Sequence, residues 1–493
     1  MLAARFYPRF PSWISSPIIR GKSAFGKNET SAFRPAIMGS EEMGGTKDQV
    51  KAVARRKLAL IFLLLFMFAL LLSPWASAPS PPIASSPKPS ANQAEPLRPA
   101  VEVKEPVSLR VAVPLDEAEF EELRKQNERQ SYLFRDIRVV LERTDPADAY
   151  SAFRQAARLG EAADVMLLKN EWVKAFASSG YLVPADAAFV GEALSEQFDA
   201  LSAPLKWNGY LWGVPRDFDP YVLVWNLAEL RKVAGESAVP PPDLAGWADL
   251  AAKARASGGT VHLLALDAQD PLALLAWVEA VTGQRTDTLW QSDNDPWNGT
   301  AKGEAIALLE REKAGVAFGV EGSIADALAA GETMSAILPN SAAHRLASER
   351  SASGVAVFLA DRYAWKLPFV WPRGRSFAIS SRTQADEAAR RWIAAMTDAA
   401  VQQANWTVSG KLPVYRSLYA NRSAGGGLSS LFPVGAAAAS SFPGQPPAES
   451  GPELPGRLDR LGRLWSEFAA GKIGAADWIR RWPETLTDLQ LDD

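Results

Sequence analysis

The segment YLWGVPRDFDPYVLVWN, residues 210–226, holds two apolar runs separated by a short polar one. Residues 210–214 and 221–225 have the aromatic and β-branched content of buried strands. Residues 215–220 contain two prolines, one arginine and two aspartates. Proline lacks an N–H donor, so it interrupts the hydrogen bonding of a central strand. The pattern predicts two buried strands joined by a polar connection, and the fold must explain why charged groups are placed there.

The charge of the chain is unevenly distributed. Residues 1–57 carry 11 Lys and Arg against 4 Asp and Glu, whereas residues 58–493 carry 42 against 52. An acidic body argues against nucleic acid as a partner. The absence of cysteine excludes disulfides, thiolate metal sites, a cysteine nucleophile and a lipid-modified cysteine. His262 and His344 are too few for a histidine metal site or a triad, and we expect no cofactor and no metal.

The N-terminal region has the features of an export signal. Basic residues within 51–57 precede the apolar run 58–72, and the next charge is Lys88. This asymmetry predicts a cytoplasmic leader, 1–57, with everything downstream outside the membrane. Residues 58–75 are either a membrane anchor or the apolar region of a signal peptide that is cleaved after secretion. Residues 76–106 are rich in Pro, Ser and Ala, which predicts an extended linker.

From residue 107 the pattern is α/β. Strands are predicted at 108–113, 137–142 and 163–168, with helices at 117–127 and 148–159 between them. This alternation predicts parallel pairing, with ligand-binding loops at the carboxyl ends of the strands. Two such loops are 114–117 and 169–172.

Further elements follow along the chain, with no internal repeat. The periodicity predicts helices at 244–256, 271–282, 302–313, 383–398, 457–470 and 475–481, strands at 354–358 and 377–380, and a glycine-rich loop at 423–456. A chain of 493 residues with these elements is long enough for two to three domains.

Six segments in succession resemble one family. They are ADVMLLKNEWVKAFASSGYLVPAD (163–186), WNGYLWGVPRDFDPYVLVWN (207–226), PPPDLAGWADLAAKA (240–254), AAGETMSAIL (329–338), FAISSRTQADEAARRWIAAM (377–396) and GKLPVYRSLY (410–419). Together they look like the signatures of extracellular solute-binding proteins of carbohydrate ABC transporters, the maltose-binding-protein-like group. The resemblance covers residues 107–487.

The resemblance implies a two-lobed α/β fold of the type II periplasmic-binding-protein kind, with the ligand cleft between the lobes. Lobe I would comprise 107–215 and 378–412, and lobe II 216–377 and 413–493. Three hinge crossings would fall near 215–220, 371–377 and 412–413. The polar connection at 215–220 would then be the first hinge, with its charged side chains facing the cleft.

Asp217 and Asp219 point the same way in an extended chain because they are two residues apart. They are candidates for accepting hydrogen bonds from sugar hydroxyls, and Asp219 occupies the family's acceptor position. The alternatives are turn chemistry, an ion pair with Arg216, or a glycosidase acid/base pair. No second carboxylate motif supports hydrolysis, so we expect a protein that is not an enzyme.

Residues 169–172 contribute four further candidates: Lys169, Asn170, Glu171 and Trp172. Their charged and amide groups can hydrogen-bond hydroxyls, and the indole can stack on a sugar face. The alternative for Trp172 is packing on Phe176, one helical turn on.

The remaining candidates come from four places in the chain. Asp116 and Glu117 match the family's first cleft loop, although acidic residues also suit a helix N-terminus. Tyr221 and Trp371 are aromatics near predicted crossings. Asn340 lies near the place where relatives often carry a Gly-x-Trp segment.

Two functions remain open on the sequence alone. The first is an extracytoplasmic binding subunit of an ABC importer, closing on a sugar and delivering it to the permease subunits. The second is a membrane-tethered sensor of the same fold that presents its closed state to a receptor such as a histidine kinase.

Overall fold

The computed structural model describes residues 105–186, 196–258, 261–290, 295–350, 356–358, 362–366, 371–420, 448 and 450–486. The predicted leader 1–57, the segment 58–75 and nearly all of the linker 76–106 lie outside these residues, as does most of the glycine-rich loop 423–456. Within the described ranges, no helix has the length and apolar character needed to cross a membrane.

The first sheet has six strands, of which five follow the order β2-β1-β3-β15-β4, and β7 pairs with β15. Their bounds are β1 (Val107–Val113), β2 (Ile137–Arg143), β3 (Val165–Lys169), β4 (Leu182–Val183), β7 (Val214–Phe218) and β15 (Gly374–Ser380). β1 pairs in parallel with both β2 and β3, which confirms the parallel pairing predicted from the strand and helix alternation. β15 runs antiparallel to β3, β4 and β7.

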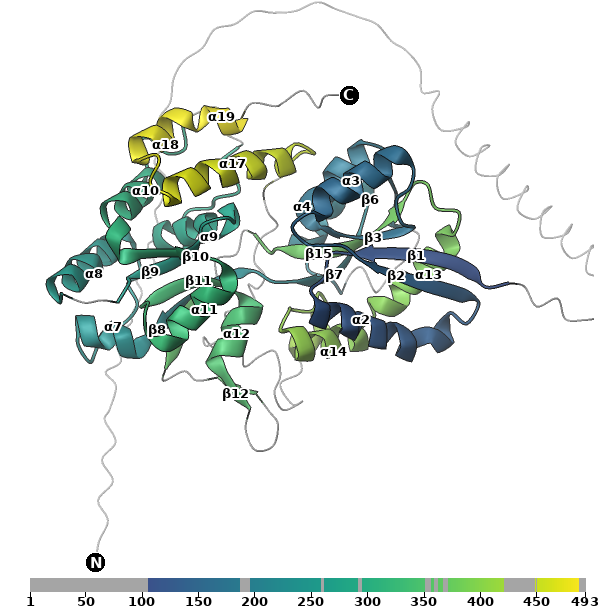
Figure 1. The fold of residues 1–493 in the computed structure, drawn as a ribbon, viewed down its shortest axis with the longest axis horizontal. Helices are drawn as coiled ribbons and strands as arrows, with labels where there is room; N and C mark the ends of the chain where they lie inside the picture. The colour runs from purple at the N-terminus through teal and green to yellow at the C-terminus, as the bar shows by residue number, and fades with distance from the viewer. Residues whose placement is uncertain are drawn as a thin grey trace, which may run out of the picture. The chain divides into compact units, whose positions relative to one another are not determined.

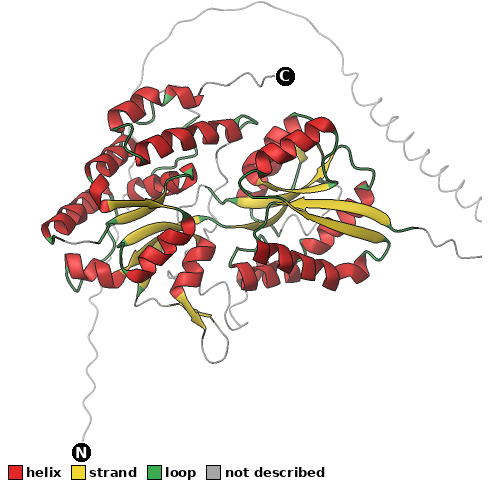
Figure 2. Cartoon of the chain, viewed as in Figure 1, coloured by secondary structure: helices red, strands yellow, loops and turns green. Residues whose placement is uncertain are grey.

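Helices cover both faces of this sheet because alternate strand residues point to opposite faces. Leu109, Val111 and Val113 pack with α2 (Glu117–Gln130) and α13 (Asp386–Met396). Ala112 packs on the other face with α3 (Ala149–Leu159) and α4 (Asn170–Ser178). α14 (Ala399–Ser409) lies against α2. Figures 1 and 2 show these helices above and below the strands.

The second sheet has five strands in the order β10-β9-β11-β8-β14. Their bounds are β8 (Tyr221–Asn226), β9 (Leu264–Asp267), β10 (Val316–Gly319), β11 (Ser335–Pro339) and β14 (Tyr363–Lys366). β8 again alternates: Tyr221, Leu223 and Trp225 face one cluster of buried residues, and Val222 and Val224 face another. The predicted strand 221–225 is therefore buried on both faces.

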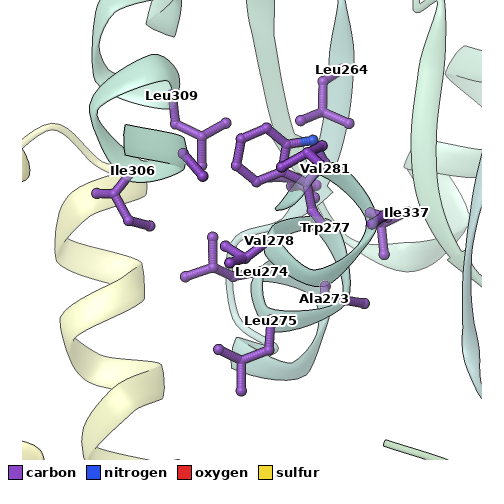
Figure 3. Packing of buried hydrophobic residues seen from close by; sticks show 14 of the residues in the cluster. Leu264, Ala273, Leu274, Leu275, Trp277, Val278, Val281, Ile306, Leu309 and Ile337 are labelled. Carbon is purple, nitrogen blue, oxygen red and sulfur yellow. The ribbon is translucent and has the colours of Figure 1, made fainter. Parts of the chain in front are cut away.

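The larger of these clusters surrounds α9 (Pro271–Thr282). Trp277 packs beside Leu264 and Ile337 of the strands and Leu309 of α10 (Ala301–Arg311), as Figure 3 shows. Helices α8 (Leu244–Ala256), α17 (Leu454–Ala469) and α18 (Ala475–Arg481) complete this side, and α11 (Glu321–Ala330) and α12 (Asn340–Ala347) cover the other. The helices predicted at 244–256, 271–282 and 475–481 are confirmed.

The remaining elements are short. They are η2 (Ser131–Leu133), α6 (Asp199–Ser202), η4 (Ala203–Leu205), β5 (Lys206–Trp207), β6 (Tyr210–Leu211), α7 (Leu227–Ala234), η5 (Lys313–Gly315), β12 (Ser348–Arg350), β13 (Ala356–Phe358), α15 (Ser417–Ala420) and α19 (Pro483–Leu486).

The opening segment departs from its prediction in one respect. The single strand predicted at 210–214 is divided into β6 and β7, and β7 continues through Pro215 to Phe218. Proline is accommodated because, among the described strands, β15 is the one partner at Pro215 and the pairing is irregular between Arg375 and Ser376. The chain passes between the sheets at 219–220, inside the predicted crossing, so the lobe boundary predicted after 215 falls within a strand.

The other two predicted boundaries also shift. β14 belongs to the second sheet and β15 to the first, so the sheet changes before Gly374 rather than at 377. Leu412 exchanges two backbone hydrogen bonds with Phe218 of β7, at 2.8 and 3.0 Å. Residues 412–415 therefore stay with the first sheet, in a cluster that includes Phe198 and Trp406. The prediction that lobe II resumes at 413 is wrong, because these apolar side chains are buried against β7.

Candidate functional site

A cavity of about 1140 Å³ lies at the carboxyl ends of strands from both sheets. From the first sheet it is lined by Pro114 and Asp116 after β1 and by Lys169 at the end of β3. From the second sheet it is lined by Asp267 and Asp270 after β9 and by Glu321 after β10. Open α/β sheets bind ligands at these ends, because the loops there converge outside the strands.

Five of the sequence candidates line this cavity: Asp116, Lys169, Glu171, Trp172 and Asp219. Asp116 is the N-cap of α2, and its carboxylate accepts a 2.8 Å hydrogen bond from the Glu119 amide. Lys169 precedes α4, and its ammonium stands 5.3 Å from the ring centre of Trp172. The loops 114–117 and 169–172 thus both reach the cavity; whether their side chains contact solute stays a prediction.

Six candidates do not line the cavity: Glu117, Asn170, Asp217, Tyr221, Asn340 and Trp371. Glu117 is exposed and pairs with Arg143 at 3.3 Å. Asn170 is buried and accepts a 2.6 Å hydrogen bond from Ser376 Oγ.

The three candidates from the second sheet's side have partners within the protein. Tyr221 donates a 2.7 Å hydrogen bond to the Asp270 carboxylate, which does line the cavity. Trp371 donates from Nε1 to Thr286 Oγ1 at 3.0 Å. Asn340 is buried, and its backbone N–H donates to the Pro220 carbonyl at 2.8 Å. Their aromatic or amide character reflects packing that a single sequence does not distinguish from ligand contact.

An ion-paired cluster forms one part of the site: Glu119, Asp217 and Asp219 with Arg375 and Lys411. Arg375 reaches both Asp217, at 2.5 Å, and Glu119, at 2.9 Å. Lys411 lies 3.4 Å from Glu119 and 3.6 Å from Asp219. Burial alone would raise the pKa of Glu119, but Arg375 and Lys411 hold it well below its usual range. Glu119 is therefore ionised and balanced by these two cations.

Asp219 has a second set of partners at the crossing. Its two carboxylate oxygens accept hydrogen bonds from the Ser341 amide at 2.9 Å and the Ser341 hydroxyl at 2.7 Å. Ser341 is the second residue of α12, so Asp219 supplies an acceptor to that helix start. Asp219 thus faces the cavity and also ties the first crossing to the second sheet's side.

An acidic cluster forms the other part: Glu171, Asp267, Asp270 and Glu321 around Arg373. The Arg373 guanidinium lies 3.8 Å from Asp270. Burial raises the pKa of Glu171, of Asp267 and of Glu321. These shifts are opposite in sign to that of Glu119, so the attraction of nearby cations does not offset the cost of burying these three carboxylates.

Arg373 itself is held in an unusual conformation. Its φ is 51°, in the left-handed region that residues other than glycine seldom adopt. The next residue is Gly374, where a Cβ atom would stand 2.3 Å from Nδ2 of Asn170. The guanidinium lies 4.2 Å from the ring centre of Tyr221, and this buried ring positions it.

Aromatic side chains line another part of the cavity wall. Trp172 lies 5.2 Å from Tyr150, which lies 6.0 Å from Phe176, with Tyr181 a further 6.0 Å on, all between ring centres. All four line the cavity. The start of α17 also lines the cavity, and just before it the Ser450 carbonyl accepts a 2.8 Å hydrogen bond from Lys174 of α4.

The sequence prediction missed several charged residues of the cavity wall: Glu119, Asp267, Asp270, Glu321, Arg373, Arg375 and Lys411. One signal was available. Asp270 precedes Pro271 at the start of α9, a typical helix beginning, and helix starts after strands lie at the ligand-binding edge.

The sequence model of the bacterial extracellular solute-binding proteins matches residues 120–424. The chain belongs to this family. Its members are extracellular binding proteins, and the match includes strands of both sheets and, apart from Glu119, the residues of both charged clusters. Among curated protein sequences, none matches the chain.

Solved structures share the fold at low sequence identity. The GacH receptor of Streptomyces glaucescens, solved with acarbose, aligns with a TM-score of 0.61 at 19% identity over 78% of this chain and 100% of the receptor. The sugar-binding protein MalE of Xanthomonas citri aligns at 0.59 and 16%, over 77% and 96%. A solute-binding protein of an ABC transporter from Thermotoga lettingae, bound to α-D-tagatose, aligns at 0.59 and 15%, over 77% and 98%. The two-lobed fold is thus confirmed.

Proposed function

We propose that the chain is the carbohydrate-binding subunit of an ABC importer. The observation that carries the proposal is the cavity itself, which combines charged hydrogen-bonding groups with an aromatic surface and draws on strands of both sheets. Sugar rings offer hydroxyls to the former and C–H faces to the latter. The similar structures were solved with acarbose and α-D-tagatose, which supports a sugar as the solute class here.

Three groups of residues are predicted to contact the solute. Asp219 and Lys411 offer charged groups near the first crossing, and Trp172 offers a stacking face. Asp116 lies at the start of α2 and Glu171 on α4. A solute that touches these groups and also Asp270, which follows β9 of the second sheet, contacts both lobes, so its binding depends on how the two lobes are arranged.

Solute binding is proposed to close the lobes about the crossings at 219–220 and before Gly374. Closure follows only when the solute binds the closed form more tightly than the open one. Groups on both sheets must therefore contact it. Asp219 faces the cavity and also binds Ser341 of α12, so it is placed to couple solute binding to lobe closure.

No catalytic function is proposed. Asp217 is held by Arg375, and both oxygens of Asp219 accept hydrogen bonds from Ser341. A glycosidase needs one protonated carboxyl and one free carboxylate on either side of the bond. Carboxylates already engaged in this way are suited to binding rather than to proton transfer.

The chain is proposed to work outside the cytoplasmic membrane, held through residues 58–75 or released after signal cleavage, and to deliver its solute to permease subunits. The basic segment before the apolar run supports this orientation. Protease added to intact cells should digest the body of the chain, and a body that is digested only after lysis would contradict the orientation.

The sugar proposal is tested by thermal-shift screening of the full-length chain, purified in detergent, against a broad panel of neutral and aminated mono- and oligosaccharides. A bound sugar stabilises the folded state by mass action, so at least one should raise the melting temperature in a concentration-dependent way. Trp172→Ala and Asp219→Ala should lower that response. No response from any sugar in the panel would contradict the proposal.

A further inference from the structure

The acidic cluster contains more negative charge than its basic neighbours balance. Glu171, Asp267, Asp270 and Glu321 all line the cavity near one guanidinium, that of Arg373. Lys169 acts on Glu171 but places its ammonium over the ring of Trp172, and Lys411 and Arg345 act on Glu321. Among the described residues, only Asp270 of the four carboxylates has a cation within 4.0 Å. In the ion-paired cluster, by contrast, Arg375 and Lys411 each contact two carboxylates within 3.6 Å.

Glu171 provides a separate indication of a ligand group. Its Oε2 atom is buried and accepts no hydrogen bond from the residues that the structure describes. A buried carboxylate oxygen without a donor is costly, because the folded protein does not replace the water that this oxygen loses. Burial raises the pKa of Glu171 for the same reason. A donor supplied by the solute removes this cost.

The surroundings favour an organic cation over a metal ion. Across the described ranges, no group of three or more His, Asp or Glu side chains is arranged to hold a metal. Two aromatic faces beside the cluster already carry cations of the chain: Lys169 over Trp172 and Arg373 over Tyr221. Ammonium groups bind well where carboxylates and aromatic faces occur together.

We infer that the solute carries a protonated amine, and that Glu171, Asp270 and Glu321 bind it: the ligand class is an amino sugar or an oligosaccharide containing one. This inference rests on the proposed sugar-binding function and specifies its ligand. The ion-paired cluster and Trp172 then contact the neutral part of the sugar. A neutral hydroxyl satisfies one oxygen of the acidic cluster, whereas an ammonium also offsets its charge.

Calorimetry on the full-length chain in detergent tests the inference with matched sugars. The probes are β-1,4-linked tetrasaccharides of glucosamine, N-acetylglucosamine and glucose, with the three monosaccharides, which differ only in the group at carbon 2. Within each series the glucosamine form should bind at least about tenfold more tightly than both neutral forms at low salt. High salt should reduce this advantage, since charge attraction is screened.

Variants assign the preference to the cluster. Glu171→Gln and Glu321→Gln keep the side-chain size and remove one charge each, so each should reduce the glucosamine advantage severalfold, with the affinity for each neutral sugar measured alongside. The control is Glu304→Gln, an exposed glutamate of α10 outside the cavity, which should alter neither.

The outcomes separate the two proposals. Equal or tighter binding of the neutral sugars overturns the amine inference while the sugar-binding function stands. An amine preference that survives in both glutamine variants also overturns it, because the cluster would not be its source. If no sugar of the broad panel binds, the function and the inference fail together.

Discussion

The two charged clusters of the cavity use the same residue types with opposite results. In the ion-paired cluster, Glu119 and Asp217 share Arg375, and the pKa of Glu119 lies well below its usual range. In the acidic cluster, Glu171 has an oxygen without a partner among the described residues, and its pKa is raised by burial. The carboxylates of the ion-paired cluster have their charged partners within the protein. In the acidic cluster, we infer that the solute supplies the missing partner.

This difference separates structural from functional charge. A buried carboxylate is tolerated when charged hydrogen bonds replace its lost hydration, and it is costly otherwise. Residues that carry such a cost occur at functional sites more often than elsewhere. The contrast therefore assigns stability mainly to Arg375 and its partners and solute recognition mainly to Glu171 and its neighbours. Four predictions test or sharpen this assignment.

The largest effect is expected for Arg375→Met. It leaves Glu119 and Asp217 buried without their main partner, which costs about 3–5 kcal/mol. Denaturant unfolding of the full-length chain measures this loss. The control is Arg391→Met: Arg391 pairs with Asp136 at an exposed site, so about 0–1 kcal/mol is expected. Equal losses of stability in the two variants would contradict the structural role assigned to Arg375.

Asp219→Ala is expected to weaken solute binding by about 1.5–3 kcal/mol, roughly tenfold or more, because it removes a charged acceptor that faces the cavity. Calorimetry with a sugar found by screening measures the change. Ser341→Ala is the matched control, since Ser341 binds Asp219 but does not line the cavity. If both variants lose the same affinity, Asp219 acts only through the crossing.

Trp172→Ala is expected to weaken the same sugar by about 0.5–1.5 kcal/mol through loss of its stacking face. Trp172→Phe keeps an aromatic face and should retain most of the affinity. Trp172 also packs on Tyr150, at 5.2 Å, so the melting temperature of the free protein should be recorded for both variants. An alanine variant that is less stable but binds as tightly would show that Trp172 only packs.

The smallest effect is a change of melting temperature with opposite signs in the two clusters. Burial raises the pKa of Glu171, so this carboxyl favours folding below the ordinary glutamate pKa, about 4.3, and that contribution is lost as the pH rises. Without solute, Glu171→Gln should therefore raise the melting temperature at pH 7 by about 1–2 °C, and the gain should vanish near pH 4.

Glu119→Gln provides the comparison for that experiment. The pKa of Glu119 is depressed, so its contribution is present above the ordinary glutamate pKa and is lost as the pH falls below it. This variant should lower the melting temperature at pH 7, with a difference that fades in acid. The same sign for Glu119→Gln and Glu171→Gln would show that the clusters do not differ as described.

Local pattern was sufficient for much of the fold and for part of the site. The helices α8, α9 and α18 agree with prediction from end to end, because apolar periodicity and clear helix starts define them. The loops 114–117 and 169–172 were found because each follows a strongly apolar strand. α17 starts at Leu454, three residues before its predicted start, because proline is accepted in a first helical turn.

The remainder of the site depends on contacts between distant parts of the chain. Arg375 and Glu119 are 256 positions apart, and nothing in either local segment indicates the other. β9 and β10 have four residues each, too few for a distinct periodicity, so Asp267, Asp270 and Glu321 were not recognised as residues at the carboxyl ends of strands. For Asp217 the alternative of an ion pair with Arg216 is present, at 3.2 Å, whereas its pair with Arg375 appears only once β7 and β15 are paired.

The most direct test of the account is small-angle X-ray scattering of the full-length chain in matched detergent, without and with the sugar found by screening. If the solute is held between lobes that close about the crossings at 219–220 and before Gly374, saturating sugar should reduce the radius of gyration. Asp219→Ala at the same sugar concentration should show a smaller reduction. Calorimetric saturation with an unchanged radius of gyration would contradict the claim that the solute is gripped between the two lobes.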